Sequence, residues 1–387
     1  MTKVRIVNAV IDGRPADIVI EDGAIAEVAD ARSGSGGKNA FDAAGKTVLP
    51  GFVDCHTHAC FAGSRLDEWE RKLAGASYLE LLEHGGGIMA TVRATRESSE
   101  AELAGLLLAR LNRMLAHGST TIEVKSGYGL DTEAELKMLR AIARAGETFA
   151  GTVMPTACIG HAIDPDVERD RFIRRTIEQT LPAVAEEFPG IALDAYCEQG
   201  AWSLEDCLAL LDAGQAAGHP IRVHADQFNA LGMIDAAVER GYLSVDHLEA
   251  SGADGLARLA ESRTFGVMLP ASGFHLDDRY GDGRAFLDAG GKLALATNYN
   301  PGSAPCWSMP FVIALAVRKL GLTPAEAITA TTSAGAELLG LEDRGRIETG
   351  MRADLIVLDC ADAREMAFEF GGNPVARVMV NGQWVRG

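Results

Sequence analysis

Residues 53–58 read Val53-Asp54-Cys55-His56-Thr57-His58, and an apolar run that begins at Thr47 leads into them. In a strand, side chains at positions i and i+2 point to the same side. His56 and His58 can therefore aim their imidazoles at one point at the end of a strand, where a metal ion could be bound. A bare His-x-His pair also occurs by chance. The apolar strand before it and the histidines later in the chain favour the metal-site interpretation.

Seven further apolar runs of β type follow, and helical patterns such as residues 133–145 and 204–217 lie between them. The eight predicted strands are residues 47–55, 120–125, 152–158, 191–197, 221–224, 243–247, 264–269 and 293–297. Strands that alternate with helices in this way predict an α/β protein built on a (β/α)8 TIM barrel, a fold of about 250 residues before insertions. A doubly wound open sheet is the alternative, but no Gly-x-Gly-x-x-Gly turn follows the first strand.

Both ends of the chain are rich in short β-type runs, and Asp-Gly or Asn-Gly pairs between them are hairpin signals. The runs are residues 4–7, 17–20, 24–28, 353–358 and 375–380. Two unrelated β tails would each be too small to bury a core. We therefore predict one composite β domain from residues 1–47 and 346–387, and a barrel domain from residues 48–345.

The composition limits the partners. The 387 residues include 36 basic and 54 acidic side chains, so the net charge is 36 − 54 = −18, which argues against nucleic acid or an anionic membrane as the main partner. The seven cysteines are scattered and form no C-x-x-C pair, as in a reduced chain. No signal segment and no bilayer-spanning apolar run occurs. We expect a cytoplasmic protein that acts on a small molecule.

Polar side chains gather where the predicted barrel strands end, and active sites of such barrels lie at the C-terminal ends of the strands. The residues at these positions are His56, His58, Lys125, Tyr128, His161, Glu198, Gln199, His224, His247, Asn298 and Asn300. Random placement would not put so many polar groups there. The pattern predicts an enzyme.

His224 ends the fifth predicted strand and is the third candidate metal ligand beside His56 and His58. Three protein ligands with an open position describe a catalytic rather than a structural metal site. His247 ends the sixth strand, and three roles are open for it: a ligand, a general acid or base near the metal, or a buried structural histidine.

Three further residues carry weaker signals. The guanidinium of Arg65 could clamp a carboxylate, although from the sequence alone an exposed surface arginine is the better explanation of the position. Tyr128 lies in a loop flanked by glycines and could offer its hydroxyl to a substrate or simply pack. Asn298 closes the eighth strand, where a metal hydrolase needs a carboxylate as ligand and proton acceptor, yet it is a neutral amide.

Together these residues resemble the amidohydrolase superfamily and, within it, the imidazolonepropionase family. The motifs that carry the resemblance are Pro50-Gly51-Phe52-Val53-Asp54 with His56 and His58, Phe61-Ala62-Gly63-Ser64-Arg65, Gly85-Gly86-Gly87-Ile88 with Thr91-Val92-Arg93-Ala94-Thr95-Arg96, Glu123-Val124-Lys125-Ser126-Gly127-Tyr128-Gly129-Leu130, His224-Ala225-Asp226-Gln227 and Asn300-Pro301-Gly302-Ser303. The run around Tyr128 and the run before Arg65 are specific to the narrower family. The resemblance implies a distorted barrel with a small composite β-sandwich domain formed by both termini.

The resemblance also implies the chemistry. One divalent or trivalent ion, zinc or iron, would be bound by His56, His58 and His224 and at the position of Asn298, with His247 as an acid/base or polarising group. The residues implied to hold the substrate are Arg65, Tyr128, His161, Gln227, Asn300, Gly302 and Ser303, with Gln227 also at the catalytic centre. The reaction implied is hydrolysis of the ring C–N bond of 4-imidazolone-5-propanoate to N-formimidoyl-L-glutamate in histidine breakdown. Members of the family are commonly homodimers, which we expect here.

Asn298 departs from the family pattern, which has an aspartate there as metal ligand and base. Loss of a general base typically lowers a rate by about 10²- to 10⁴-fold. Three interpretations are open: a natural variant with weak or altered activity in which His247 is the base, an engineered and impaired form, or a site without metal. Of these, we favour an engineered or impaired form. Two alternative functions are hydrolysis of another cyclic amide or amidine, and a catalytically inactive binding protein.

Overall fold

The first strand of the barrel leads into the two histidines, and residues after the last strand pair with the same stretch. In the computed structural model, which describes residues 3–31, 40–75 and 86–386, eight strands form one sheet in which neighbours in space are consecutive along the chain. They are β6 (Phe52–Asp54), β7 (Ser119–Lys125), β8 (Thr152–Gly160), β9 (Ala192–Cys197), β10 (Arg222–Ala225), β11 (Ser244–His247), β12 (Phe265–Met268) and β13 (Leu293–Leu295). The backbone N–H of His58 donates to the carbonyl of Tyr299 at 3.0 Å, so residues after β6 meet residues after β13. The predicted (β/α)8 barrel is confirmed.

The prediction of one continuous first strand, residues 47–55, is wrong in detail. The structure divides it into β5 (Val48–Pro50), which pairs antiparallel with β14 (Leu355–Leu358), and β6, which pairs parallel with β7. Gly51 lies between them, and a Cβ at this position would be 2.2 Å from Oγ1 of Thr120. Only glycine therefore lets the chain pass this close to β7 as it leaves one sheet for the other.

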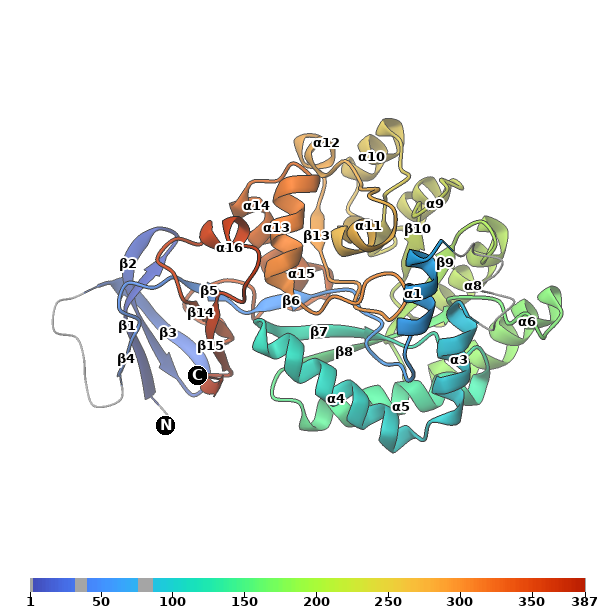
Figure 1. Ribbon diagram of the computed structural model, residues 1–387, viewed down its shortest axis with the longest axis horizontal. Helices are drawn as coiled ribbons and strands as arrows, with labels where there is room; N and C mark the ends of the chain where they lie inside the picture. Colours follow the sequence, from blue (N-terminus) through green and yellow to red (C-terminus); the bar gives the residue numbers. More distant parts are fainter. Residues whose placement is uncertain (1–2, 32–39, 76–85, 387) are drawn as a thin grey trace.

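Two four-stranded sheets form the β-sandwich, and both ends of the chain contribute to it (Figure 1). One sheet contains β1 (Lys3–Ile11), β2 (Arg14–Glu21), β3 (Ala24–Asp30) and β4 (Ala40–Asp42), and the other contains β5, β14, β15 (Val375–Val380) and β16 (Gln383–Arg386). Ile6 and Ile18 from the first sheet share a buried cluster with Leu355, Val357 and Met379 from the second. The composite β domain predicted from the terminal β runs is confirmed, and it has the sandwich form that the family resemblance implied.

Helices surround the barrel, and the two clearest helical patterns are confirmed. They are α5 (Thr132–Thr148) and α8 (Leu204–Ala216). The other helical elements are α1 (Leu66–Leu73), α3 (Ile88–Glu97), α4 (Glu100–Ala116), α6 (Arg169–Arg175), the π-helical turn η1 (Thr176–Thr180), α7 (Leu181–Glu187), α9 (Met233–Arg240), α10 (Ala253–Ala260), α11 (Pro270–Leu276), α12 (Gly283–Asp288), α13 (Met309–Lys319), α14 (Pro324–Ala330), α15 (Ser333–Leu338) and α16 (Glu365–Phe368). None of these described helices is long and apolar enough to span a bilayer.

Local sequence explains several boundaries. Ser99 begins α4 with a capping box, in which its hydroxyl accepts from the N–H of Glu102 and the Glu102 carboxylate accepts from the N–H of Ser99. Asp12 and Gly13 both have positive φ (49° and 74°), as a tight hairpin turn between β1 and β2 requires. Of the motifs quoted above, Gly85 lies outside the described residues.

Candidate active site

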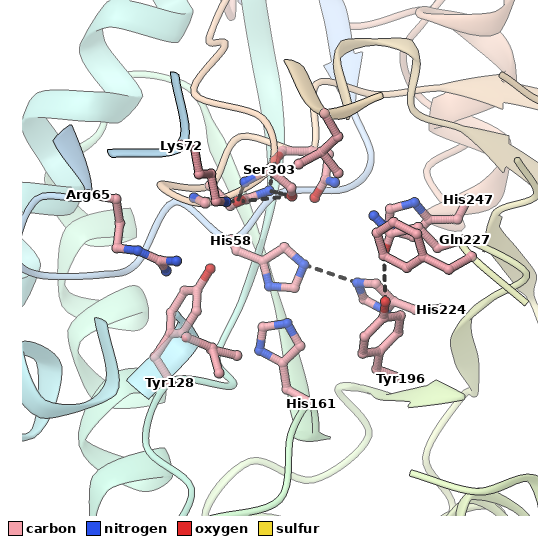
Figure 2. A pocket seen from close by; sticks show the side chains of 16 residues that line it. His58, Arg65, Lys72, Tyr128, His161, Tyr196, His224, Gln227, His247 and Ser303 are labelled. Carbon is pink, nitrogen blue, oxygen red and sulfur yellow. Dashed lines mark hydrogen bonds between the residues drawn. The ribbon is translucent and has the colours of Figure 1, made fainter. Parts of the chain in front are cut away.

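A cavity of about 260 Å³ opens at the C-terminal ends of the barrel strands. Its walls consist of His58, Arg65, Lys72, Ile88, Tyr128, His161, Tyr196, His224, Gln227, Phe228, His247, Leu276, Asn298, Asn300, Gly302 and Ser303. Figure 2 shows His58 near its centre, with Arg65 on one side and His224 and His247 on the other. Eleven of the twelve predicted site residues line this one cavity. The twelfth, His56, is fully buried next to His224, with ring centroids 4.5 Å apart.

The three candidate ligands converge although 168 residues separate the first from the last (224 − 56). Possible ligand atoms of His56, His58 and His224 all lie within 4.8 Å of one another. The Nε2 atoms of His58 and His224 face each other at 3.0 Å, and Nε2 of His56 is buried without a hydrogen-bond partner in the described chain. Burial and the neighbouring positive charges hold the pKa values of His56 and His58 well below their usual range, so the rings are neutral. Neutral imidazoles with inward lone pairs fit a metal ion.

Carboxylates behind the cluster orient two of these rings. Nδ1 of His56 lies 2.6 Å from Oδ2 of Asp246, and Nδ1 of His224 lies 2.8 Å from Oδ1 of Asp194. A ring that donates from Nδ1 presents the lone pair of Nε2 on its other side. This carboxylate–histidine arrangement is typical of metal ligands. Neither aspartate was predicted as a site residue, because each lies inside a buried strand rather than at its end.

Asn298 is also oriented by a neighbour. Its Nδ2 donates to Oγ of Ser272 at 2.8 Å, which leaves the buried Oδ1 without a partner among the described residues. Its φ of 52° is unusual for a residue other than glycine. A neutral amide oxygen in the wall of the cavity can ligate a cation, but it cannot take a proton as a carboxylate does.

His247 lies across the cavity from His58. Its Nδ1 is 3.1 and 3.2 Å from the two carboxylate oxygens of Glu249, so Nδ1–H donates and Nε2 carries the lone pair. The φ of His247 is 95°, a strained value that frequently marks functional positions. Its ring centroid is 5.5 Å from that of His224. His247 is therefore positioned to exchange a proton next to the histidine cluster.

His161 and Tyr128 form the wall beneath His58 in Figure 2. Nδ1 of His161 donates to the carbonyl of Gly127 at 2.8 Å, so its Nε2 is an acceptor. Burial and the neighbouring His224 lower the pKa of His161 to about 4, and the ring is neutral at pH 7. Burial raises the pKa of Tyr128, which keeps its hydroxyl protonated as a donor. The two side chains thus offer one acceptor and one donor.

Arg65 and Lys72 bring positive charge to the mouth of the cavity. Glu68 accepts two hydrogen bonds of 2.6 Å from Arg65, from Nε and Nη2, and lies 3.2 Å from Nζ of Lys72. Among the residues that the structure describes, Nη1 of Arg65 has only a long contact of 3.4 Å with Oγ1 of Thr91. Two cations share one carboxylate, so a net positive charge remains for an anion.

The loop after β13 is built by Asn300. Its Oδ1 accepts from the N–H groups of Gly302 (2.9 Å) and Ser303 (2.7 Å), and its Nδ2 donates to the carbonyl of Asn298 at 2.7 Å. The polar atoms of the Asn300 side chain are therefore engaged in hydrogen bonds within this loop, and these bonds shape the cavity wall. Ser303 stays close enough to line the cavity.

Five residues of the cavity wall were not predicted as site residues, and two of them, Lys72 and Tyr196, carry polar groups. Lys72 lies one turn after Glu68 on α1, and its charge beside Arg65 was the available signal. Tyr196 donates its hydroxyl to Oε1 of Gln227 at 2.7 Å and so turns the amide NH₂ of Gln227 to other partners. Its position one residue before the end of β9 was the signal. Glu198, in contrast, accepts hydrogen bonds from the backbone N–H groups of Phe228 and Asn229 in the loop after β10.

Residues 47–385 match the model of the Amidohydrolase family. The imidazolonepropionase of Herpetosiphon aurantiacus is 46% identical over 357 residues, which cover 89% of this chain and 83% of that protein. The chain belongs to the imidazolonepropionases of the amidohydrolase family. The imidazolonepropionase of Deinococcus radiodurans agrees, at 44% identity over 367 residues, 95% of this chain and 91% of that protein.

Solved structures support the fold. The 5-methylcytosine deaminase from Klebsiella pneumoniae superposes with a TM-score of 0.80 at 17% identity, over 99% of this chain and 97% of that one. The N-isopropylammelide isopropylaminohydrolase from Burkholderia multivorans gives a TM-score of 0.71 at 19% identity, over 100% and 98%. Amidohydrolases are metal-dependent, and the cluster of His56, His58 and His224 is a possible metal site in this member.

Proposed function

We propose that this protein hydrolyses the ring C–N bond of 4-imidazolone-5-propanoate to give N-formimidoyl-L-glutamate, with one zinc or iron ion at the histidine cluster. The observation that carries the proposal is one cavity that joins three convergent neutral histidines to a cationic mouth. Relatives at 39–46% identity bear the name imidazolonepropionase. A substrate with a polar ring and a carboxylate tail matches both ends of the cavity.

Substrate recognition follows from the groups already described. Arg65 and Lys72 would bind the propanoate carboxylate through charge-assisted hydrogen bonds. The lone pair of His161 Nε2 would accept from a ring N–H, and the hydroxyl of Tyr128 would donate. Tyr196 holds Gln227 so that its amide NH₂ can donate to the ring.

His56, His58, His224 and the amide oxygen of Asn298 would hold the ion, which when bound lowers the pKa of water and polarises a carbonyl. In the reaction the oxygen of water bonds to the ring carbonyl carbon, the C–N bond breaks, and the ring nitrogen gains a proton. His247 can accept the water proton at Nε2 while Glu249 stabilises the imidazolium through Nδ1. It can then donate that proton to the departing nitrogen.

The neutral Asn298 makes His247 the proton acceptor with the best geometry in the described cavity. The family has an aspartate at this position, so we infer a lower rate for this chain. Hydrolysis of a different cyclic amide or amidine, or binding without turnover, would use the same cavity.

Metal analysis and a turnover assay on the parent and on Asn298→Asp test the proposal. We expect about one ion per chain in both, and a kcat about 10²- to 10⁴-fold higher in Asn298→Asp, because a ligating base is restored. Asn373→Asp makes the same chemical change next to Ala116, whose carbonyl Asn373 contacts at 2.8 Å, and should leave kcat unchanged. Metal without turnover in parent and variant alike would contradict hydrolysis and favour a binding protein.

A further inference from the structure

Five charged side chains lie buried directly behind the histidine cluster, and their contacts join them into one network. They are Glu123, Lys125, Asp194, Arg222 and Asp246. We infer that Glu123, at the centre of this network, is a positioning residue that sets the geometry of all three candidate metal ligands. The inference rests on the proposed function and deepens its metal site.

Glu123 holds the spacer between the first two histidines. Oε2 of Glu123 accepts from the N–H of Thr57 at 3.0 Å, and the backbone carbonyl of Glu123 accepts from Oγ1 of Thr57 at 2.6 Å. The N–H of Lys125 adds a bond of 3.0 Å to the carbonyl of Thr57. Since Thr57 lies between His56 and His58, these bonds fix the backbone that carries both imidazoles.

Glu123 also connects the two carboxylate–histidine pairs. Its Oε1 lies 2.8 Å from Nζ of Lys125, which in turn contacts Oδ2 of Asp194 at 2.7 Å. Asp194 is the carboxylate that holds Nδ1 of His224.

The second connection runs through Arg222. Its Nη1 is 3.4 Å from Oε1 of Glu123, and its Nη2 donates to Oδ2 of Asp246 at 2.7 Å. The same oxygen of Asp246 holds Nδ1 of His56. One carboxylate therefore reaches each of the three rings, either directly through Thr57 or through one cation and one aspartate.

The burial of this network argues for a role beyond stability. Each of the five side chains is at most 1% exposed, and burying charges is expensive even when they are paired. The interior layers of such barrels are ordinarily filled by branched apolar residues, which carry no such cost. Three carboxylates and two cations give −3 + 2 = −1, whereas the proposed ligands including Asn298 are all neutral. The network thus places a negative charge behind a site that lacks a charged ligand.

Zinc binding in the absence of substrate tests the inference. We expect Glu123→Gln to weaken the zinc Kd, measured by competition with a chelator, by about 10- to 100-fold, as for other residues that orient metal ligands. The d–d spectrum of Co²⁺ bound in place of zinc should change as well, since the ligand geometry changes. A purely structural role would lower the melting temperature without moving either readout.

Glu135→Gln is the matched control. Glu135 is a buried carboxylate that accepts from the N–H groups of Gly127, Gly129 and Leu130, and these hydrogen bonds involve none of the three histidine ligands. It should lower the melting temperature and leave the zinc Kd unchanged. An equal zinc Kd for Glu123→Gln and the parent, with a melting temperature lowered as in Glu135→Gln, would overturn the inference.

A milder variant covers the case in which Glu123→Gln does not fold. Glu123→Asp keeps the negative charge but draws the carboxylate back from the N–H of Thr57, so the 3.0 Å bond is lost, and we expect zinc binding roughly 2- to 10-fold weaker. An unchanged Kd for this variant would also overturn the inference. A parent chain that binds no zinc or cobalt would instead contradict the metal site of the proposed function.

Discussion

The two ends of the cavity are built in different ways. The inner end, formed by His56, His58 and His224, lies at or just after the C-terminal ends of strands and is at most 3% exposed. The outer end is formed by Arg65, which immediately precedes α1, and by Glu68 and Lys72 on α1. The Lys72 side chain is 39% exposed. Backbone register and buried carboxylates position the inner end, whereas one salt-bridged helix positions the outer end. Chemistry and substrate choice can therefore change independently.

Removing an inner ligand should produce the largest effect. We expect His224→Ala to lose its metal and to lower turnover by about 10³-fold or more, since metal catalysis supplies several kcal/mol. Metal content and kcat are the measurements. His117→Ala is the control, because His117 contacts Ser308 and does not line the cavity. Full metal content in His224→Ala would show that the three histidines are not the ligand set.

Changes at the outer end should affect binding and spare the metal. We expect Arg65→Met to weaken the binding of 3-(imidazol-4-yl)propanoate, an unreactive carboxylate analogue, by about 10- to 100-fold, the value of a hydrogen bond to a charged group. Lys72→Met should have a smaller effect, about 2- to 5-fold, because its ammonium is more exposed. Calorimetric titration measures both.

Imidazole, which has no carboxylate, is the control ligand for this pair of variants. Its affinity should be the same in the parent, Arg65→Met and Lys72→Met. If Arg65→Met weakened the binding of imidazole and of the propanoate equally, Arg65 would support the cavity rather than bind the carboxylate. The two ends of the cavity would then not be independent.

The same contrast explains what the sequence could predict. Period-2 spacing predicted that His56 and His58 point to one side, and polar residues at the ends of the predicted strands indicated the active end of the barrel. Both inferences needed only local pattern. The resemblance to a known family added Gln227, Gly302 and Ser303, which pattern alone did not select.

Other features depend on tertiary pairing, which local pattern does not record. The run of residues 47–55 reads as one strand, yet contacts with β14 and β7 divide it at Gly51. Glu123, Asp194 and Asp246 lie within strands, where a charged residue ordinarily indicates a solvent-facing position. Only the closed barrel shows that their side chains meet behind the histidines.

The ion pair that anchors the outer end should give the smallest effect, and its pH dependence is distinctive. Burial alone would raise the pKa of Glu68, but the hydrogen bonds and charge of Arg65 outweigh it and lower the pKa from 4.5 to about 2. A carboxyl with a lowered pKa stabilises the folded state above its unfolded pKa, and this contribution is lost as pH falls toward the folded value.

We therefore expect Glu68→Gln to lower the free energy of unfolding by about 1 kcal/mol at pH 7, the upper end for pairs that contact solvent. The difference from the parent should persist down to about pH 4.5 and shrink as the pH approaches 2, because protonated Glu68 resembles glutamine. Urea unfolding of both proteins across this range is the measurement. A difference that vanished already near pH 5 would mean that Arg65 does not hold Glu68 ionised, and α1 would then need another anchor for the outer end of the cavity.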